Sequence, residues 1–229
     1  MKSIGIILTP DNRSKAYLTK IIQNKLKMDK IIFLNDNRSE KTYDEQIESE
    51  AQKCGFSINV KVKDMLKKNK LEYRQFNVVD INNAKLISYL KTLSIDFFIF
   101  TGGGILRKDI LNSGPKFIHL HPGIVPEYRG STCFYYSMIN ENNCGVTAFI
   151  MDEKLDTGEI IHQKIFEKPN HQFIDEVFDA HIRSETLIEL LQNKMYEKDS
   201  FTKQSPLEGE TYHIIHPVLK HIAILSCIN

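Results

Sequence analysis

The sequence lacks an excess of either charge and has no long apolar run. Its 229 residues include 30 lysines and arginines against 29 aspartates and glutamates. So nearly neutral a chain has too weak a field to coat nucleic acid or an anionic membrane. None of its apolar runs approaches the roughly 20 residues that a membrane-spanning helix needs. Charge and hydropathy therefore exclude nucleic-acid coating and membrane spanning.

The sequence also lacks paired cysteines and a secretion signal. The apolar stretch Ile4–Leu8 follows a basic start but is too short for a signal peptide. A chain of this size buries roughly 70–75% of its unfolded surface and needs no crosslink or metal to fold. We therefore expect a cytoplasmic protein with reduced thiols, because no C-x-x-C pair occurs among its four cysteines: Cys54, Cys133, Cys144 and Cys227.

The first half of the chain alternates short β-branched runs with amphipathic stretches. The apolar runs Ile4–Thr9, Lys30–Leu34 and Ile95–Phe100 are typical of strands covered on both faces, as parallel strands are. Residues at helical spacing lie between them. This pattern predicts an α/β fold with a Rossmann-like, doubly wound, mostly parallel sheet and right-handed crossovers. A helix over Tyr43–Cys54 and a short strand over Leu71–Phe76 belong to the same pattern.

The second half has a different pattern. Gly145–Met151 and Gly158–Phe166 are strand-like runs around a short polar stretch, which predicts an antiparallel hairpin. Apolar residues from Phe173 onward predict one or two helices. The segment Tyr212–Ile228 is apolar again and either returns to the sheet or packs over it.

A lysine-rich stretch, Ser57–Lys70, interrupts the first half. It is compatible with a solvated helix face or with a local patch that attracts anionic ligands. Further along, Ser131 and Thr132 are predicted to cap a helix that runs towards Ile139. Cys133 lies at the start of that helix, where its thiol has either a lowered pKa or an inert, partly buried position.

Chemistry-bearing residues concentrate between Thr101 and Gly130. Thr101–Gly104 is a threonine followed by three glycines, directly after a predicted buried strand, where open α/β sheets bind ligands. The glycines allow close approach of a flat ligand or simply form a tight turn. They do not form the G-x-G-x-x-G pattern of dinucleotide sites.

Two histidines follow on the next predicted strand. The period of two places His119 and His121 on one face of the strand's end. With Asp156 they are compatible with a zinc triad. They are equally compatible with acid/base and oxyanion chemistry, since histidine titrates near neutrality.

The run 119–130, H-L-H-P-G-I-V-P-E-Y-R-G, followed by Asp156-Thr157-Gly158, resembles the signature of the 10-formyltetrahydrofolate-dependent formyltransferases. That family includes glycinamide ribonucleotide, methionyl-tRNA and sugar N-formyltransferases. The resemblance spans roughly Ile95 to Ile161. It implies the formyltransferase fold, with residues 1–200 as the catalytic core and 201–229 as a C-terminal extension packed on it.

The resemblance also implies roles for individual residues. His121 and Asp156 correspond to the catalytic histidine and aspartate, and 10-formyltetrahydrofolate is the expected formyl donor. Loop backbone is expected to hold its pteridine at Gly103, Gly104, Ile105, Leu106, Met151, Asp152, Glu153, Lys154 and Leu155. Tyr128, Arg129 and Gly130 are expected to bind the substrate, with a structural clamp as the alternative for Arg129.

One position departs from the family signature. His119 stands where the family usually has asparagine, which donates an N–H to the oxyanion. Histidine also donates, so we keep His119 among the catalytic residues. Losing one such donor costs about 2.7–4 kcal/mol. The added titratable group predicts a pH profile different from that of relatives with asparagine.

The expected acceptor is a small amine, such as an amino sugar on a nucleotide, an amino acid or a natural-product precursor. The loop Thr9–Ser14 lacks the glycine-rich phosphate loop of the glycinamide ribonucleotide enzymes. The stretch after Ile161 is too short and not basic enough for a tRNA-reading domain. We expect no metal, nucleic-acid or membrane partner, and a homodimer stays open. The alternatives are a formyltetrahydrofolate hydrolase and a non-catalytic folate- or nucleotide-binding relative.

Overall fold

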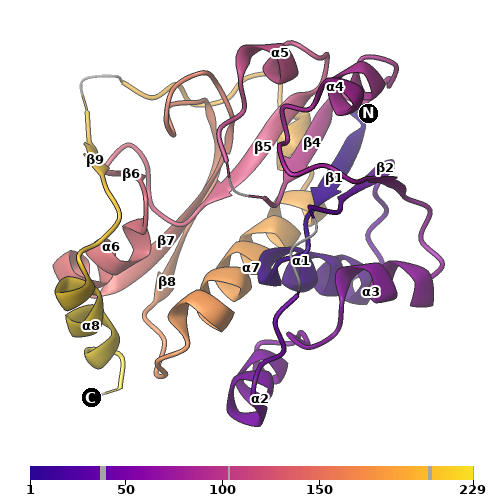
Figure 1. Cartoon of the computed structure of the whole chain (residues 1–229). Coiled ribbons are helices and arrows are strands. Elements are labelled where there is room, and N and C mark those ends of the chain that lie inside the picture. The colour runs from indigo at the N-terminus through magenta and orange to yellow at the C-terminus, as the bar shows by residue number, and fades with distance from the viewer. Residues whose placement is uncertain (37–39, 103, 206–207, 229) are drawn as a thin grey trace. The chain divides into compact units, whose positions relative to one another are not determined.

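The computed structural model describes residues 1–36, 40–102, 104–205 and 208–228. Its contacts divide the chain into two compact units, Met1–His119 and the part from Leu120 onward. Figure 1 shows the course of the chain through both. No helix of the described residues is long and apolar enough to cross a membrane.

The first unit is built on parallel strands, as the apolar runs predict. Neighbouring strands pair in parallel throughout, with Gly5 of β1 opposite both Lys30 of β2 and Phe98 of β4. The third strand begins at Arg74, three residues later than predicted. The order is β3-β2-β1-β4-β5, with β1 at Ile4–Leu8, β2 at Lys30–Leu34, β3 at Arg74–Phe76, β4 at Phe97–Phe100 and β5 at Lys116–His121.

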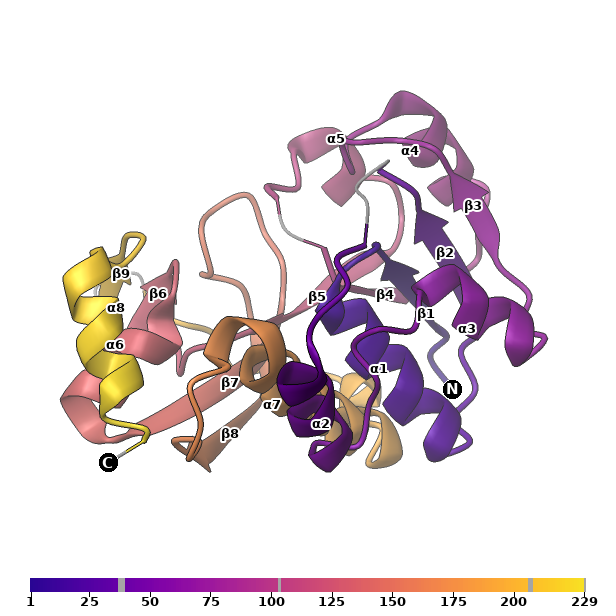
Figure 2. The same ribbon diagram turned by 60° about the horizontal axis from the view of Figure 1, so that its bottom comes forward.

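Helices connect these strands. The side chain of Asp11 caps the first of them by accepting from Ser14 N–H. In the lysine-rich stretch, Val62 and Leu66 are buried while Lys67 and Lys68 are exposed, as expected of a solvated helix face. Figure 2 shows α1 and α3 side by side. The helices are α1 at Asn12–Gln23, α2 at Glu45–Lys53, α3 at Val62–Lys68, α4 at Ala84–Leu90 and α5 at Lys108–Leu111.

The second unit contains the predicted antiparallel hairpin, β7 (Asn143–Ile150) and β8 (Ile160–Glu167). The order of the main sheet continues through β5, which both units share, to β7 and β8. The predicted mostly parallel α/β sheet with a C-terminal antiparallel hairpin is thus confirmed. After β8 come a π-helical turn, Ile174–Phe178, helix α7 at Asp179–Gln192 and a 3-10 turn, Met195–Glu197.

A second, two-stranded sheet was not predicted. Its strands, β6 (Tyr128–Gly130) and β9 (Glu210–Tyr212), pair in parallel. Helix α6 (Cys133–Glu141) packs beside the C-terminal helix α8 (Pro217–Leu225), as both views show (Figures 1 and 2). The apolar segment near the C-terminus therefore forms a short strand and a helix.

Candidate functional site

Strand β5 carries both predicted histidines. His121 is its last residue and only 2% exposed, whereas His119, two residues earlier, is half-buried. Arg183 of α7 donates from Nη1 to the carbonyl oxygen of Leu120 at 2.8 Å, which fixes the backbone directly before His121. Its guanidinium also pairs with Asp179. No local pattern predicts this support, because Arg183 lies 63 residues from Leu120 along the chain.

Both ring nitrogens of His121 face atoms of the same unit. Nε2 lies 2.8 Å from the carbonyl oxygen of Tyr128, and Nδ1 lies 3.5 Å from Oδ2 of Asp156. A carbonyl only accepts, so Nε2 carries a hydrogen. The site at which His121 can gain or release a proton is therefore Nδ1, beside the carboxylate. This brings together the predicted pair His121 and Asp156.

The backbone around Asp156 orients its carboxylate. Asp156 has a φ of 53°, the left-handed region that non-glycine residues seldom adopt. Its Oδ2 accepts from Gly130 N–H at 2.8 Å. Oδ2 thus faces a backbone donor on one side and the imidazole on the other, which directs its charge towards Nδ1 of His121.

Burial and charge act in opposite directions on His121. Burial lowers the pKa of His121 below its ordinary value and outweighs Asp156 and the Tyr128 carbonyl, which favour the charged ring. Arg183 adds to the lowering and Asp179 opposes it. The resting ring is therefore neutral, and it becomes charged only where Asp156 can stabilise it.

A glycine makes room for the ring. A Cβ on Gly123 would lie 2.6 Å from the Tyr128 carbonyl oxygen, 2.8 Å from Nε2 of His121 and 2.9 Å from the Cβ of Cys133. No real Cβ tolerates such distances. The H-P-G turn after His121 thus lets the backbone pass directly beside the imidazole.

The helix after this turn begins at Cys133, as predicted, but without the predicted cap bond. Thr132 has a φ of 54° and its hydroxyl donates to the Ser131 carbonyl, so it does not cap the helix through its side chain. Burial, together with the charge of Asp156, raises the pKa of the Cys133 thiol to about 12. Of the two interpretations of Cys133, the structure supports the inert, buried thiol.

The first predicted folate loop lies in the first unit. Gly103 falls outside the described residues. Gly104 is exposed with a φ of 116°, Ile105 is 75% exposed and Leu106 is buried. Asn82 holds this loop through two bonds, from its amide to the Ile105 carbonyl at 2.9 Å and from Arg107 N–H to its Oδ1 at 2.7 Å.

The second predicted folate loop, Met151–Leu155, lies in the second unit. Met151 is half-buried and the other four residues are exposed. The Asp152 carboxylate accepts from Lys154 N–H at 3.0 Å and from the Thr157 hydroxyl at 2.9 Å. Asp152 thus ties this loop to Thr157, and contact of the loop's backbone with the pteridine stays a prediction.

The residues predicted to bind substrate make contacts within the second unit. The Tyr128 hydroxyl donates to Glu141 at 2.7 Å. Arg129 is 5% exposed and donates to Gln204, Ser205 and Glu208. Gly130 has a φ of 103°, and a Cβ there would lie 2.1 Å from the Tyr212 carbonyl oxygen. A role of these residues in binding substrate stays a prediction.

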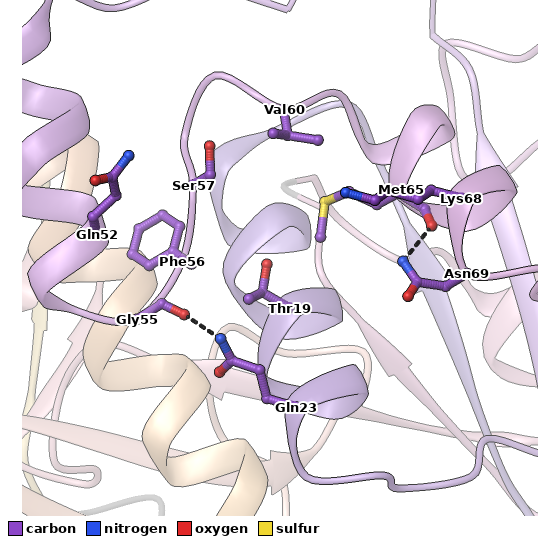
Figure 3. A pocket seen from close by; sticks show the side chains of 10 residues that line it. All are labelled: Thr19, Gln23, Gln52, Gly55, Phe56, Ser57, Val60, Met65, Lys68 and Asn69. Atoms are coloured by element: carbon purple, nitrogen blue, oxygen red, sulfur yellow. Dashed lines mark hydrogen bonds between the residues drawn. The ribbon is translucent and has the colours of Figure 1, made fainter.

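Each unit contains a cavity that is lined by its own residues. In the first unit, a cavity of about 440 Å³ is lined mainly by Phe56, Val60, Met65 and polar side chains. Figure 3 shows these side chains, with Gln23 bonded to the Gly55 carbonyl. In the second unit, about 420 Å³ lies beside the motif loop, and Tyr128 is among its walls. Within the described residues, no group of three or more histidine, cysteine, aspartate or glutamate side chains could hold a metal ion.

Residues 6–180, most of the chain, match the family described as formyl transferase. The chain belongs to the formyltransferase family. It is 31% identical over 136 residues to methionyl-tRNA formyltransferase of Nitratiruptor sp., covering 58% of this chain and 45% of that protein. It is 33% identical over 180 residues to the bifunctional polymyxin resistance protein ArnA of Wigglesworthia glossinidia brevipalpis. That match covers 71% of this chain and 27% of ArnA. The chain therefore spans less than half the length of these curated relatives.

Solved formyltransferases share the fold. An N-formyltransferase from Helicobacter canadensis, in complex with folinic acid and dTDP-3-aminofucose, has a TM-score of 0.64 and 17% identity, covering 100% of this chain and 81% of that one. Glycinamide ribonucleotide transformylase 1 from Symbiobacterium toebii has a TM-score of 0.60 and 12% identity. The match covers 90% of this chain and 95% of that one. At these identities the likeness establishes the fold alone.

Proposed function

We propose that this formyltransferase moves the formyl group of 10-formyltetrahydrofolate to the amine of a small molecule. The observation that carries the proposal is the buried His121 with its Nδ1 3.5 Å from the Asp156 carboxylate, inside the H-x-H-P-G segment of this chain, which differs from the family signature at His119. A buried base beside a carboxylate can take a proton where water is excluded.

In the proposed reaction the amine forms a bond to the formyl carbon of the donor, and the bond from that carbon to the folate nitrogen breaks. Tetrahydrofolate leaves after taking up the proton that the amine first gives to His121. His121 receives a proton at Nδ1, and Asp156 stabilises the resulting imidazolium. His119 is proposed to donate to the oxyanion in place of the usual asparagine. The backbones of Gly104–Leu106 and Met151–Leu155 are proposed to contact the pteridine. Tyr128, Arg129 and Gly130 are still proposed to lie next to the acceptor. The side chains of Tyr128 and Arg129 are proposed to act mainly by shaping the loop.

A small acceptor, in particular an amino sugar on a nucleotide, has two supports. The chain's formal net charge is +1, which gives little attraction for a polyanion such as tRNA. The Helicobacter canadensis enzyme, which matches along this whole chain, was solved with dTDP-3-aminofucose. A homodimer, and a division into a core of residues 1–200 with an extension of 201–229, stay predictions.

The test is turnover with 10-formyltetrahydrofolate and a panel of nucleotide-linked amino sugars and amino acids, followed by release of tetrahydrofolate. We expect release that depends on one class of amine and is lost in His121→Gln. Consumption of the donor without any amine would instead identify a hydrolase. Folate binding without consumption would identify a non-catalytic relative.

A further inference from the structure

A glutamine near the C-terminal end of the chain is bonded to the backbone of the Asp156 loop. Gln204 Nε2 donates to the Gly158 carbonyl at 2.7 Å and to the Asp156 carbonyl at 3.1 Å. These bonds span 46 and 48 residues of sequence. The amide therefore bridges the two ends of the D-T-G turn, from outside that turn.

The other end of the same amide is held by Arg129. Gln204 Oε1 accepts from Arg129 Nε at 3.1 Å and from Nη2 at 2.9 Å. A guanidinium only donates and a carbonyl only accepts, so the orientation of the amide is fixed by both neighbours. Arg129 is itself anchored, because it also donates to the carbonyls of Glu208 at 2.9 Å and Ser205 at 3.0 Å.

This arrangement reaches Asp156 from two directions. Gln204 holds its backbone carbonyl, and Gly130, the residue after Arg129, donates N–H to its carboxylate at 2.8 Å. Asp156 needs such restraint because its φ of 53° is unfavourable for a residue with a side chain. If the turn relaxes, the carboxylate leaves its place beside Nδ1 of His121.

We propose that Gln204, clamped by Arg129, is a positioning residue that holds the Asp156 carboxylate against His121. This inference rests on the proposed formyl transfer for its kinetic readout. It assigns to residue 204 a part in the active site without contact to substrate. It also gives the buried Arg129 a defined purpose: fixing the amide of Gln204.

The discriminating variant is Gln204→Glu. It keeps the size of the side chain and the acceptor for Arg129, but places an oxygen opposite the carbonyls of Asp156 and Gly158. We expect kcat to fall about 10²-fold, as a displacement of about 1 Å in a catalytic group can cause. The KM for the formyl donor should stay within about threefold. Gln172→Glu is the matched control, since it makes the same change at an exposed glutamine of the second unit, and should leave kcat unchanged.

The pH profile separates positioning from a general loss of structure. With Asp156 displaced, the imidazolium of His121 loses stabilisation, so the acidic limb of the kcat profile should move to lower pH. If Gln204→Glu fails to fold, Gln204→Met removes both sets of hydrogen bonds without adding a charge. The NMR titration of the His121 ring should then show its midpoint shifted to lower pH as well.

Two results would overturn the proposal. One is that folded Gln204 variants keep the kcat and the acidic limb of the pH profile of the unmodified protein. The other is an unchanged His121 titration in Gln204→Met, which tests positioning even if no acceptor supports turnover. Absence of turnover in the unmodified protein contradicts the proposed function instead, so the two failures are distinguishable.

Discussion

His121 and Asp156 face each other at 3.5 Å, between Nδ1 and Oδ2, while Nε2 of the same ring donates to the Tyr128 carbonyl. The separation exceeds the 2.7–3.2 Å of an ordinary N–H···O bond, so the contact is mainly one of charge. Its strength therefore depends on whether the ring is protonated. A neutral His121 gains little from Asp156, and a charged one gains most.

Removing the charge of Asp156 should impair catalysis more than folding. In Asp156→Asn, the amide oxygen can still accept from Gly130 N–H, but it no longer stabilises the imidazolium. We expect kcat to fall about 10²- to 10⁴-fold, the range of general acid–base catalysis, with the melting temperature nearly unchanged. Steady-state kinetics and thermal unfolding measure the two. Asp199→Asn, at an exposed aspartate of the same unit, is the control, and equal kcat for both variants would contradict the assignment.

The buried ring should make folding sensitive to acid. The folded pKa of His121 is lowered by burial, whereas in the unfolded chain it is about 6.5. The unfolded state therefore binds more protons, and the stability tied to the neutral ring is present above the unfolded pKa and is lost as pH falls below it.

We expect urea unfolding to show a larger loss of unfolding free energy between pH 7 and pH 5 in the unmodified protein than in His121→Gln. The other histidines contribute equally to both proteins, so the difference isolates His121. Equal losses would show that the His121 ring does not keep a lowered pKa.

The sheet was predictable because its signals are local. The second strand coincides with its apolar run, Lys30–Leu34, and the first differs by a single residue. The third strand begins later than predicted because only the last three residues of the predicted run Leu71–Phe76 pair with β2. Side-chain capping by Thr132 was wrong, since its hydroxyl bonds the Ser131 carbonyl and Ile215 N–H instead.

The support of the site was not predictable from local pattern. His121 and Asp156 are found through the motif, but Gln204 contacts the Asp156 turn across 48 residues and Arg129 across 75. A single glutamine in a polar stretch carries no periodicity. The parallel pairing of Tyr128–Gly130 with Glu210–Tyr212 could not be predicted either, because strands of three residues have no sequence pattern that exceeds chance.

The turn beside the imidazole should tolerate no side chain. In Gly123→Ala the new Cβ would displace the Tyr128 carbonyl or the His121 ring. We expect a loss of about 1–3 kcal/mol of unfolding free energy, typical of overpacking, together with loss of turnover. Gly114→Ala is the comparison, because Gly114 has a positive φ but no atom within 4 Å of a Cβ. It should cost stability through backbone strain alone and keep turnover, and loss of turnover in both variants would contradict a local effect at His121.

The four thiols should differ in their rate of alkylation. Cys54 is half-buried, whereas Cys133, Cys144 and Cys227 are buried and burial raises the pKa of all three thiols. With a pKa of about 12 for Cys133, only roughly one thiol in 10⁴ is ionised at pH 8, and the thiolate is the reactive form. Brief iodoacetamide treatment followed by peptide mass spectrometry should therefore label Cys54 first, with the others appearing only after unfolding in urea. Labelling of Cys133 as fast as Cys54 in the folded protein would mean that the helix start beside Asp156 is open to solvent, and that His121 is not shielded as its burial implies.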